Sequence, residues 1–261
     1  MHITDKNVDG GKAFDWGKTS ADYARYRDIY PQEFYDKITS RALCITGQNV
    51  LDIGTGTGVL PRNMVRYGAT WTGTDISEQQ IEQAKMLSVN MDIKYYALPT
   101  EHIDFPKNSF DVITACQCFW YFDHEHIMPK LYDMLKPNGR ILILYMAWLP
   151  FEDKIAGASE NLVLKYNPEW NGCGERIHPI SIPKCYRDKF EYVYHEEYPL
   201  SIKFTRESWH GRMKACRGVG ASLSEDEVKA WEEEHMQLLQ EIAPSEFEVL
   251  HYGAIAELRK V

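Results

Sequence analysis

The stretch Asn49-Val50-Leu51-Asp52-Ile53-Gly54-Thr55-Gly56-Thr57-Gly58 decides the fold class. Residues 49–53 are a short apolar run that ends in glycines, which is typical of a buried strand. Residues 59–67 predict a helix, with Gly68 as its stop signal. The glycine spacing is G-x-G-x-G, and Val59 stands where dinucleotide-binding proteins carry their third glycine. A turn of this kind between a strand and a helix lets a ligand approach the backbone.

Asp75 is the second half of this signal. It ends the next apolar run, 70–75, and follows Gly54 by 21 residues (75 − 54). An acidic residue at the end of a second strand can accept hydrogen bonds from both hydroxyls of a ribose. The glycine loop and this acid together predict a site for a ligand that contains ribose.

The remaining pattern alternates strands and helices up to residue 148. Further strands are predicted at 93–97, 110–116 and 140–148, and helices from Ser77 to about Ser88 and at 125–135. The tetrapeptide 136–139 (KPNG) predicts a turn. Strands that alternate with helices indicate βαβ units and a parallel sheet that is covered on both faces. Right-handed crossovers then make the sheet doubly wound and Rossmann-like.

The pattern changes after residue 148. Residues 150–188 are rich in Pro, Gly and aromatics and predict an irregular lid. Strands are predicted at 190–200 and 247–258, with helices at 207–216 and 224–242 between them. The fold class expected is α/β, with a mostly parallel seven-stranded sheet and a helical or irregular cap from the C-terminal half. We expect one domain, 1–261, divided into an N-terminal helical segment (1–45), a cofactor-binding core (46–148), a lid (149–188) and a completion of the sheet with a helical insertion (189–261).

Composition narrows the class of partner. The chain has 261 residues, with 29 Lys and Arg against 38 Asp and Glu, so its net charge is −9. An acidic chain repels phosphate backbones, and nucleic acid is not expected as a partner. No apolar run reaches the length of a membrane span, and the first 18 residues lack the apolar core of a signal peptide. Cys116 and Cys118 form a C-x-C pair of a kind that zinc sites use, but no second pair stands at metal-ligand spacing. The six cysteines are therefore typical of reduced cytoplasmic thiols, so we expect a cytoplasmic protein without a metal.

Four stretches carry a resemblance to a known family: VLDIGTGTG (50–58), GTDIS (73–77), ALPTEHIDFPKNSFDVITACQCFWYFD (97–123) and LKPNGRILI (135–143). On these residues the chain resembles the class I S-adenosylmethionine-dependent methyltransferases, in particular the small-molecule group called type 11. The resemblance implies S-adenosyl-L-methionine as cofactor, S-adenosyl-L-homocysteine as product and a small-molecule methyl acceptor. It leaves the acceptor, its nucleophilic atom and the oligomeric state open.

The resemblance also implies roles for individual residues. The glycine loop would face the methionine part of the cofactor, Asp75 the ribose, and the turn 100–102 the adenine. Arg27, in a motif at 23–31 (YARYRDIYP), would approach the cofactor carboxylate. The implied cofactor contacts are Arg27, Asp52, Gly54, Thr55, Gly56, Gly58, Asp75, Ile76, Gln80, Thr100, Glu101, His102, Cys116 and Gln117.

The acceptor site and the catalytic residues are less well defined by the sequence. The tyrosines and tryptophans of 119–121 and 145–148 either belong to the core or line the acceptor site. Arg212 lies on a helix face with Trp209 and Met213, where it would suit an anionic substrate or simply pack against the protein. The candidate acceptor residues are Trp120, Tyr121, Trp148 and Arg212. A general base is needed only if the bound nucleophile carries a proton, and His178 and His210 are the candidates.

Two other functions fit the same pattern. A nicotinamide-dependent oxidoreductase uses a similar sheet, although Val59 in place of a glycine argues against it. A non-catalytic protein that binds S-adenosylmethionine would carry the same glycine loop and acid. Titration with NADH and S-adenosylhomocysteine separates the first alternative, and transfer of a labelled methyl group excludes the second.

Overall fold

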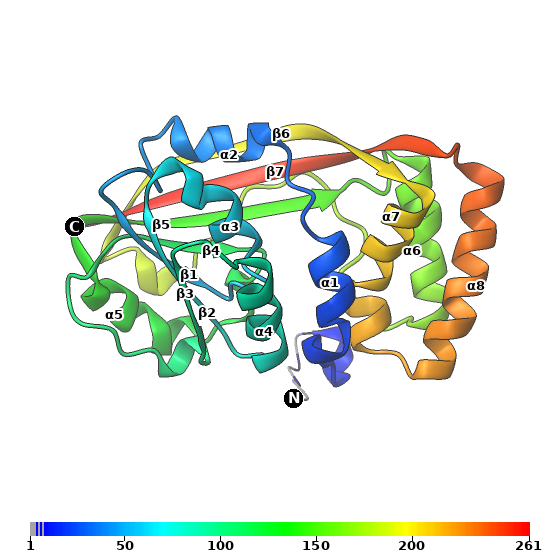
Figure 1. The fold of residues 1–261 in the computed structure, drawn as a ribbon, viewed down its shortest axis with the longest axis horizontal. Coiled ribbons are helices and arrows are strands. Elements are labelled where there is room, and N and C mark those ends of the chain that lie inside the picture. The colour runs from blue at the N-terminus through cyan, green and yellow to red at the C-terminus, as the bar shows by residue number, and fades with distance from the viewer. Residues whose placement is uncertain (1–3, 5, 7) are drawn as a thin grey trace. The chain divides into compact units, whose positions relative to one another are not determined.

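The computed structural model describes residues 4, 6 and 8–261, which form two compact units (Figure 1). Unit 1 comprises the described residues of Met1–Ile29 together with Ala147–Ile177 and Pro199–Tyr252. Unit 2 comprises Tyr30–Met146, His178–Tyr198 and Gly253–Val261. The chain thus passes from one unit to the other several times, and the expected single domain stays a prediction.

A sheet of seven strands has the order β3-β2-β1-β4-β5-β7-β6. Its first four strands lie in unit 2 and have the bounds that the sequence predicts: β1 (Asn49–Ile53), β2 (Thr70–Asp75), β3 (Ile93–Ala97) and β4 (Phe110–Cys116). The pairs β1–β2, β2–β3, β1–β4 and β4–β5 are parallel. Strand order reverses between β1 and β4, and a ligand of such a sheet binds at that point, outside the carboxyl ends of the strands. The expected fold class is confirmed.

The last three strands are longer than expected. They are β5 (Leu135–Trp148), β6 (Phe190–Thr205) and β7 (Glu246–Lys260), and residues of each fall in both units. The turn expected at 136–139 lies inside β5, where Asn138 has a φ of +60°. The pairing of β4 with β5 shifts register between Phe110 and Val112. The KPNG tetrapeptide therefore marks a local irregularity at the start of β5. A strand can accommodate extra residues in this way as a bulge.

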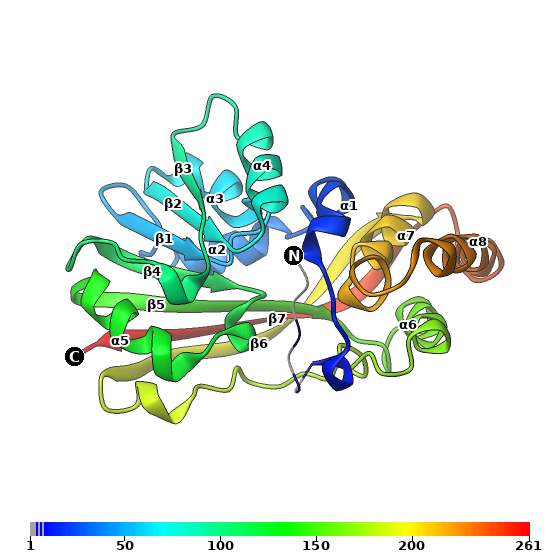
Figure 2. The same cartoon turned by 90° about the horizontal axis from the view of Figure 1, so that it is seen from below.

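Helices cover both faces of the strands of unit 2. The helices α3 (Val59–Met64) and α4 (Glu78–Leu87) lie on one side, and α5 (His124–Met134) lies on the other (Figure 2). On the α5 side, alternate residues of β1, β4 and β5 form the core with α5. That core includes Leu51, Ile53, Ile113, Ala115, Ile127, Leu131, Ile141 and Ile143. Because helices cover both faces of the sheet, both sets of alternating side chains are buried. These strands are therefore continuous apolar runs in the sequence.

Local signals fix the ends of these helices. Ser77 accepts a hydrogen bond from the backbone N–H of Gln80 and so caps α4. Asp123 caps α5 in the same way through the N–H of His126. After α3 the chain continues as a short 3-10 turn, Val65–Tyr67, and Gly68 then adopts a φ of +88°. Caps of this kind satisfy the N–H groups of the first turn, and glycine supplies the left-handed residue that ends a helix.

Unit 1 contains α1 (Ser20–Tyr26), α6 (Lys154–Tyr166), α7 (Arg206–Lys214) and α8 (Glu225–Ile242). Ser224 and Glu227 form a capping box at the start of α8, in which the Ser224 hydroxyl accepts from the N–H of Glu227. The expectation that 150–188 is irregular was wrong for α6. Asp153 caps that helix by accepting from the N–H groups of Ile155 and Ala156. The flanking Pro- and Gly-rich residues hid this signal in the sequence. The remaining helix, α2 (Gln32–Thr39), belongs to unit 2.

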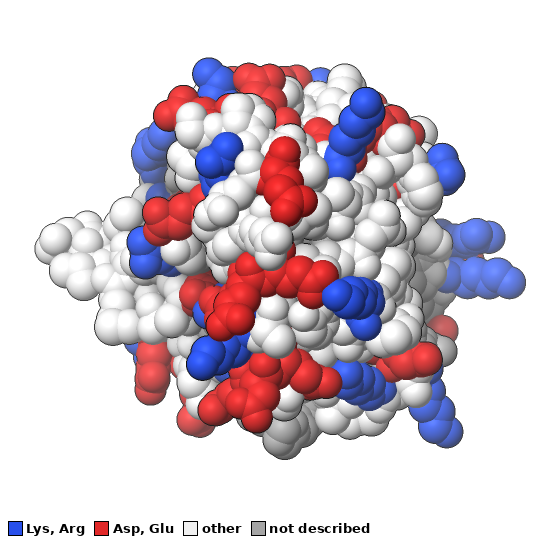
Figure 3. Space-filling view, turned by 90° about the vertical axis from the view of Figure 1, so that its right-hand side faces the viewer, with Lys and Arg blue, Asp and Glu red and all other residues white. Residues whose placement is uncertain are grey.

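The surface is rich in charge of both signs. On the face drawn in Figure 3, acidic side chains gather across the middle and Lys and Arg side chains are scattered around them. That face therefore presents no continuous basic surface to a phosphate backbone. In the described part of the chain, no helix is long and apolar enough to cross a membrane.

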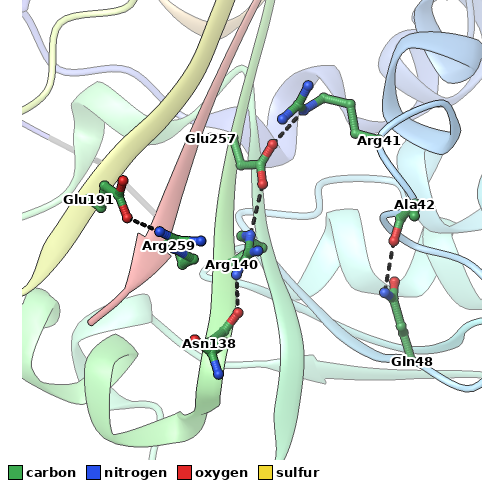
Figure 4. Close-up of polar contacts among 8 residues, drawn as sticks. All are labelled: Arg41, Ala42, Gln48, Asn138, Arg140, Glu191, Glu257 and Arg259. Atoms are coloured by element: carbon green, nitrogen blue, oxygen red, sulfur yellow. Dashed lines mark hydrogen bonds and ion pairs between the residues drawn. The ribbon is translucent and has the colours of Figure 1, made fainter.

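Glu257 on β7 joins two arginines within unit 2. Its carboxylate accepts from Nε of Arg41 at 2.5 Å and from Nε of Arg140 at 2.8 Å (Figure 4). The Glu257 side chain is 5% exposed, while those of the arginines are about a quarter exposed. The guanidinium of Arg41 also lies 3.7 Å from the ring centroid of Tyr194. A buried carboxylate with two charged donors fixes the register of the elements that carry them.

Glu257→Gln is expected to lower the free energy of unfolding by about 2–4 kcal/mol, because it leaves two partly buried guanidinium groups without their counter-charge. Glu191→Gln is the matched control, since Glu191 pairs with Arg259 nearby but both side chains are well exposed (Figure 4). The control should cost less than about 1 kcal/mol. Urea unfolding followed by circular dichroism measures both, and equal effects of the two variants would contradict a stabilising role for the Glu257 network.

Candidate active site

The loop between β1 and α3 is built from three glycines in left-handed conformations. Their φ angles are +64° at Gly54, +56° at Gly56 and +74° at Gly58. A Cβ on Gly54 would lie 2.7 Å from Sγ of Cys118, and a Cβ on Gly58 would overlap the ring of Tyr95. The sequence analysis predicts that these glycines allow a ligand to approach the backbone. The structure adds that side chains of unit 2 itself already occupy the space at two of the three positions.

Asp75 ties this loop to the end of β2. Its Oδ2 accepts from the N–H of Gly56 at 2.8 Å, and its Oδ1 accepts from the N–H of Ser77 at 2.9 Å. Burial raises the pKa of Asp75, and the two backbone hydrogen bonds oppose that shift. Each carboxylate oxygen has more than one lone pair, so both can accept a further hydrogen bond from a ligand. The acid therefore anchors the loop and retains capacity to bind hydroxyl groups.

Asp52 is buried one residue before the end of β1. Its Oδ1 accepts from the hydroxyl of Thr114 on β4 at 2.6 Å. Burial raises the pKa of Asp52 to about 7, while hydrogen bonds from Thr114 and Thr55 hold it down and the charge of Asp75 adds to the rise. Two acidic side chains thus flank the same loop, and the more buried one changes protonation state near neutral pH.

The residues after β4 close the other side of this loop. Gln117 has a φ of +65°, and its Nε2 donates to the carbonyl of Met146 at 2.5 Å. The thiol of Cys118 donates to the carbonyl of Ile53 at 3.0 Å, and burial raises its pKa well above the ordinary value. The thiol of Cys116 contacts the hydroxyl of Tyr30 at 3.5 Å. Cys118 is therefore a protonated packing residue of the loop.

The turn after β3 holds the remaining predicted contacts. Thr100 is buried and His102 is exposed within the 3-10 turn Thr100–His102. The carbonyl of Glu101 accepts from Nζ of Lys130 at 2.5 Å, and its carboxylate accepts from the N–H of Asp123 at 3.4 Å. Ile76 is half-buried and Gln80 is buried at the start of α4.

Aromatic side chains gather at the carboxyl ends of β4 and β5. Trp120 is 47% exposed and meets Tyr145 edge-on, with 4.9 Å between the ring centroids. Tyr121 lies 5.7 Å from Trp120, and the ring of His178 lies 6.2 Å from that of Tyr145. Nδ1 of His178 donates to the carbonyl of Pro179. The structure thus brings together two predicted acceptor residues, one predicted base and Tyr145, which belongs to the aromatic stretch 145–148.

The other predicted residues belong to unit 1. Arg27 donates to the hydroxyl of Tyr23 at 3.0 Å, and its guanidinium lies 4.6 Å from the centroid of that ring. His210 and His235 face each other through their Nδ1 atoms at 3.0 Å, and burial lowers the pKa of both. Trp148 and Arg212 are buried and in contact. His210 therefore belongs to a packed network of unit 1, in which His235 reaches the hydroxyl of Ser159 at 2.9 Å.

A metal-ligand cluster is not found in the part of the chain that the structure describes, where no three His, Cys, Asp or Glu side chains gather as ligands.

Known proteins share this loop and its surrounding strands. Residues 51–143 match the family model described as a methyltransferase domain. The ubiquinone biosynthesis O-methyltransferase of Bradyrhizobium diazoefficiens is 34% identical over 137 residues, which cover 49% of this chain and 53% of that protein. The same-named protein of Neisseria meningitidis serogroup C is 31% identical over 148 residues, with 52% and 61% covered. The matched stretch spans only 53–61% of the length of these relatives.

Solved structures show the same fold at low sequence identity. The YcgJ protein of Bacillus subtilis has a TM-score of 0.52 at 17% identity, with 88% of this chain and 99% of that chain covered. A SAM-dependent methyltransferase of Geobacter sulfurreducens, in complex with S-adenosyl-L-homocysteine, has a TM-score of 0.52 at 16% identity, with 94% and 98% covered. At this level of identity the similarity establishes the fold.

Asp52→Asn should change how stability depends on pH. A carboxyl whose pKa rises on folding stabilises the protein below its unfolded pKa, and this contribution is lost as pH rises through the folded pKa. For Asp52 the loss runs from about pH 4 to about pH 7. Urea unfolding at a series of pH values should therefore show a smaller decline for Asp52→Asn than for the wild type. The exposed carboxyl of Asp92 provides the control, and an unchanged slope in Asp52→Asn would contradict the assignment.

Gly54→Ala should destabilise the protein for two separable reasons. The left-handed φ costs an alanine about 1 kcal/mol, and the clash with Cys118 costs about 1–3 kcal/mol more. Cys118→Gly removes the two atoms that would lie within 3.0 Å of the new Cβ and leaves Cζ of Phe122 at 3.4 Å. The double variant should therefore be more stable than the sum of the two single effects, by about the clash contribution. Chemical unfolding of the four proteins measures this coupling, and strict additivity would exclude the clash.

Proposed function

We propose that the chain is a class I S-adenosylmethionine-dependent methyltransferase that transfers a methyl group from S-adenosylmethionine to a small-molecule acceptor, because residues 51–143 match a methyltransferase domain. The observation that carries this proposal is the hydrogen bond from the N–H of Gly56 to Asp75, which holds a glycine loop and a carboxylate together at the switch point of the sheet. The names of the relatives describe the reactions of those proteins and do not identify the methyl acceptor of this chain.

The residues present fit S-adenosylmethionine. Asp75 can accept the two ribose hydroxyls in addition to its two backbone donors. The hydroxyl of Thr57, in the glycine loop, is buried and has no hydrogen-bond partner among the described residues, as expected of a loop that has a further polar neighbour when loaded. We propose that Arg27 binds the carboxylate of the cofactor. The other proposed cofactor contacts are Asp52, Gly54, Thr55, Gly56, Gly58, Asp75, Ile76, Gln80, Thr100, Glu101, His102, Cys116 and Gln117.

The chain contributes positioning rather than covalent chemistry. When bound, S-adenosylmethionine supplies an activated methyl group, which bonds to a lone pair of the acceptor while the carbon–sulfur bond breaks and leaves S-adenosylhomocysteine. The glycine loop and Asp75 fix one partner of that reaction, and Trp120, Tyr121 and Tyr145 offer apolar ring faces that exclude water and attract a cation. We assign Trp148 and Arg212 to the acceptor. His178 is the proposed base in unit 2 if the acceptor must lose a proton.

His210, the other candidate base, is less suited to that role than His178. Its ring stacks at 5.3 Å on Trp231 and at 5.1 Å on His235, and its Nδ1 is engaged with the latter. We therefore propose a structural role for His210. A cytoplasmic location, expected from six cysteines that form no disulfide, is part of the same proposal.

Asp75→Ala should weaken the binding of S-adenosylhomocysteine by about 1.5–3 kcal/mol, or roughly 10- to 150-fold, because charge-assisted hydrogen bonds to the ribose are lost. Isothermal titration calorimetry measures the affinity, and Asp92→Asn is the control for an exposed carboxylate. Asp75→Asn keeps one acceptor oxygen and should fall between Asp75→Ala and the wild type. Unchanged affinity in both Asp75 variants would show that the ribose assignment is wrong.

The same calorimeter separates the rival functions. The wild-type protein should bind S-adenosylhomocysteine and give no heat with NADH. Transfer of a labelled methyl group from S-adenosylmethionine to any member of a metabolite panel then distinguishes an enzyme from a protein that only binds the cofactor. Tight NADH binding without a response to S-adenosylhomocysteine would reject the proposal.

A further inference from the structure

The side chain of Tyr95 extends from the edge strand β3 to the glycine loop. Tyr95 is 7% exposed, and its register partner on β2 is Gly73. A Cβ on Gly73 would lie 2.9 Å from Cδ1 of Tyr95. A Cβ on Gly58 would lie 2.9 Å from Cζ of Tyr95 and closer still to its hydroxyl. The ring therefore crosses the bare backbone of β2 and ends against the last glycine of the loop.

The tip of this side chain is held by the end of α4. The hydroxyls of Tyr95 and Ser88 lie 3.0 Å apart, and Ser88 is the buried C-cap residue of that helix. Ile81 and Ala84 of α4 form one buried cluster with Tyr95. Burial raises the pKa of Tyr95 to about 12, so the phenol keeps its proton at neutral pH. Packing along the ring and a hydrogen bond at its end thus fix its position.

The loop that Tyr95 meets carries the candidate site. The N–H of Gly56 donates to Asp75, which ties the middle of the loop to the end of β2. Gly58 lies two residues further on, donates to the carbonyl of Thr55 at 2.9 Å and is the N-cap residue of α3. Its φ of +74° is one that residues with a side chain rarely adopt. A displacement of Gly58 would therefore be passed on to the part of the loop that meets Asp75.

We propose that Tyr95 is a positioning residue for the cofactor: it rests on Gly73, contacts Gly58, is held by Ser88, and so keeps the glycine loop in the geometry that binds S-adenosylmethionine. This inference rests on the proposed function for its ligand. Glycine in a strand often marks a place where another group comes close to the backbone, and at Gly73 that group is the phenol ring. Two glycines of this chain therefore accommodate a side chain of the protein itself.

The first test is the affinity of folded variants for S-adenosylhomocysteine, measured by isothermal titration calorimetry. Tyr95→Phe removes the atom nearest to Gly58 together with the hydrogen bond to Ser88, and it should weaken binding about tenfold. Ser88→Ala keeps the phenol and should weaken binding about threefold. Tyr96→Phe is the matched control, because Tyr96 is the next residue of the same strand and is 42% exposed. Its affinity should equal that of the wild type.

A second ligand separates positioning from a purely structural role. 5′-Methylthioadenosine shares adenine and ribose with S-adenosylhomocysteine but lacks the amino-acid part, which under the proposed function faces the glycine loop. Tyr95→Phe should weaken its binding less than about threefold, so the ratio of the two affinities should change. Ile127→Val alters the core on the α5 side and should lower stability while leaving this ratio unchanged. An unchanged ratio in Tyr95→Phe would overturn the inference.

Hydrogen exchange of the ligand-free protein reports on the loop itself. The backbone amides of 54–58 should exchange at least about fivefold faster in Tyr95→Phe than in the wild type, because the loop opens more often. The same amides should be unaffected in Tyr96→Phe. If Tyr95→Phe does not fold, Ser88→Ala gives both measurements with the phenol in place, and no change in either would overturn the inference.

The outcomes separate the two proposals. Normal binding of S-adenosylhomocysteine by the wild type, with unchanged affinity in Tyr95→Phe, overturns the positioning role and leaves methyl transfer intact. A wild-type protein that does not bind S-adenosylhomocysteine overturns the proposed function, and with it the ligand of this inference. Hydrogen exchange then still decides whether Tyr95 holds the loop.

Discussion

The candidate site of unit 2 depends on one contact, the hydrogen bond from the backbone N–H of Gly56 to the carboxylate of Asp75. A second tie, from the N–H of Thr55 to the carbonyl of Thr74 at 2.8 Å, makes the loop after β1 and the end of β2 one rigid piece. Left-handed φ angles are needed for the chain to turn in this way, which only glycine adopts at little cost. Asp75 fixes the loop and would also accept the hydrogen bonds of a ribose. The same carboxylate therefore determines both the geometry of the loop and the affinity for the ligand.

The sequence predicts unit 2 well because its strands are covered on both faces. Such strands are continuous apolar runs, and β1 to β4 have the predicted bounds because glycines and polar residues end each run. Prediction failed where a local turn signal was overridden, as in KPNG at the start of β5, because strand pairing there is decided by residues distant in the chain. It also failed for α6, whose single cap at Asp153 stands among Pro- and Gly-rich residues.

The candidate site was predicted less completely than the fold, for a related reason. Spacing along one chain segment identified the glycines and Asp75, because loop and acid are defined by the strands that they follow. It did not identify Cys118 or Tyr95 as the side chains that require Gly54 and Gly58, since those contacts join separate strands. Likewise the sequence offers nine histidines, of which it singles out His178 and His210 as candidate bases. Only the hydrogen bonds show that His210 is engaged with His235, whereas His251 presents a buried lone pair.

The family match explains why the acceptor has to be argued from other residues. Residues 51–143 lie wholly within unit 2, which carries the glycine loop and both of its acids. Unit 1 lies outside that match, and its core is built from four buried tryptophans, 148, 170, 209 and 231. Large rings leave few polar atoms to satisfy, so each buried polar group among them has a specific cost and calls for a specific partner. Arg217 meets this cost by donating to both carboxylate oxygens of Asp9. Contacts between distant segments of the chain thus place polar groups in the core of unit 1, which the family match does not cover.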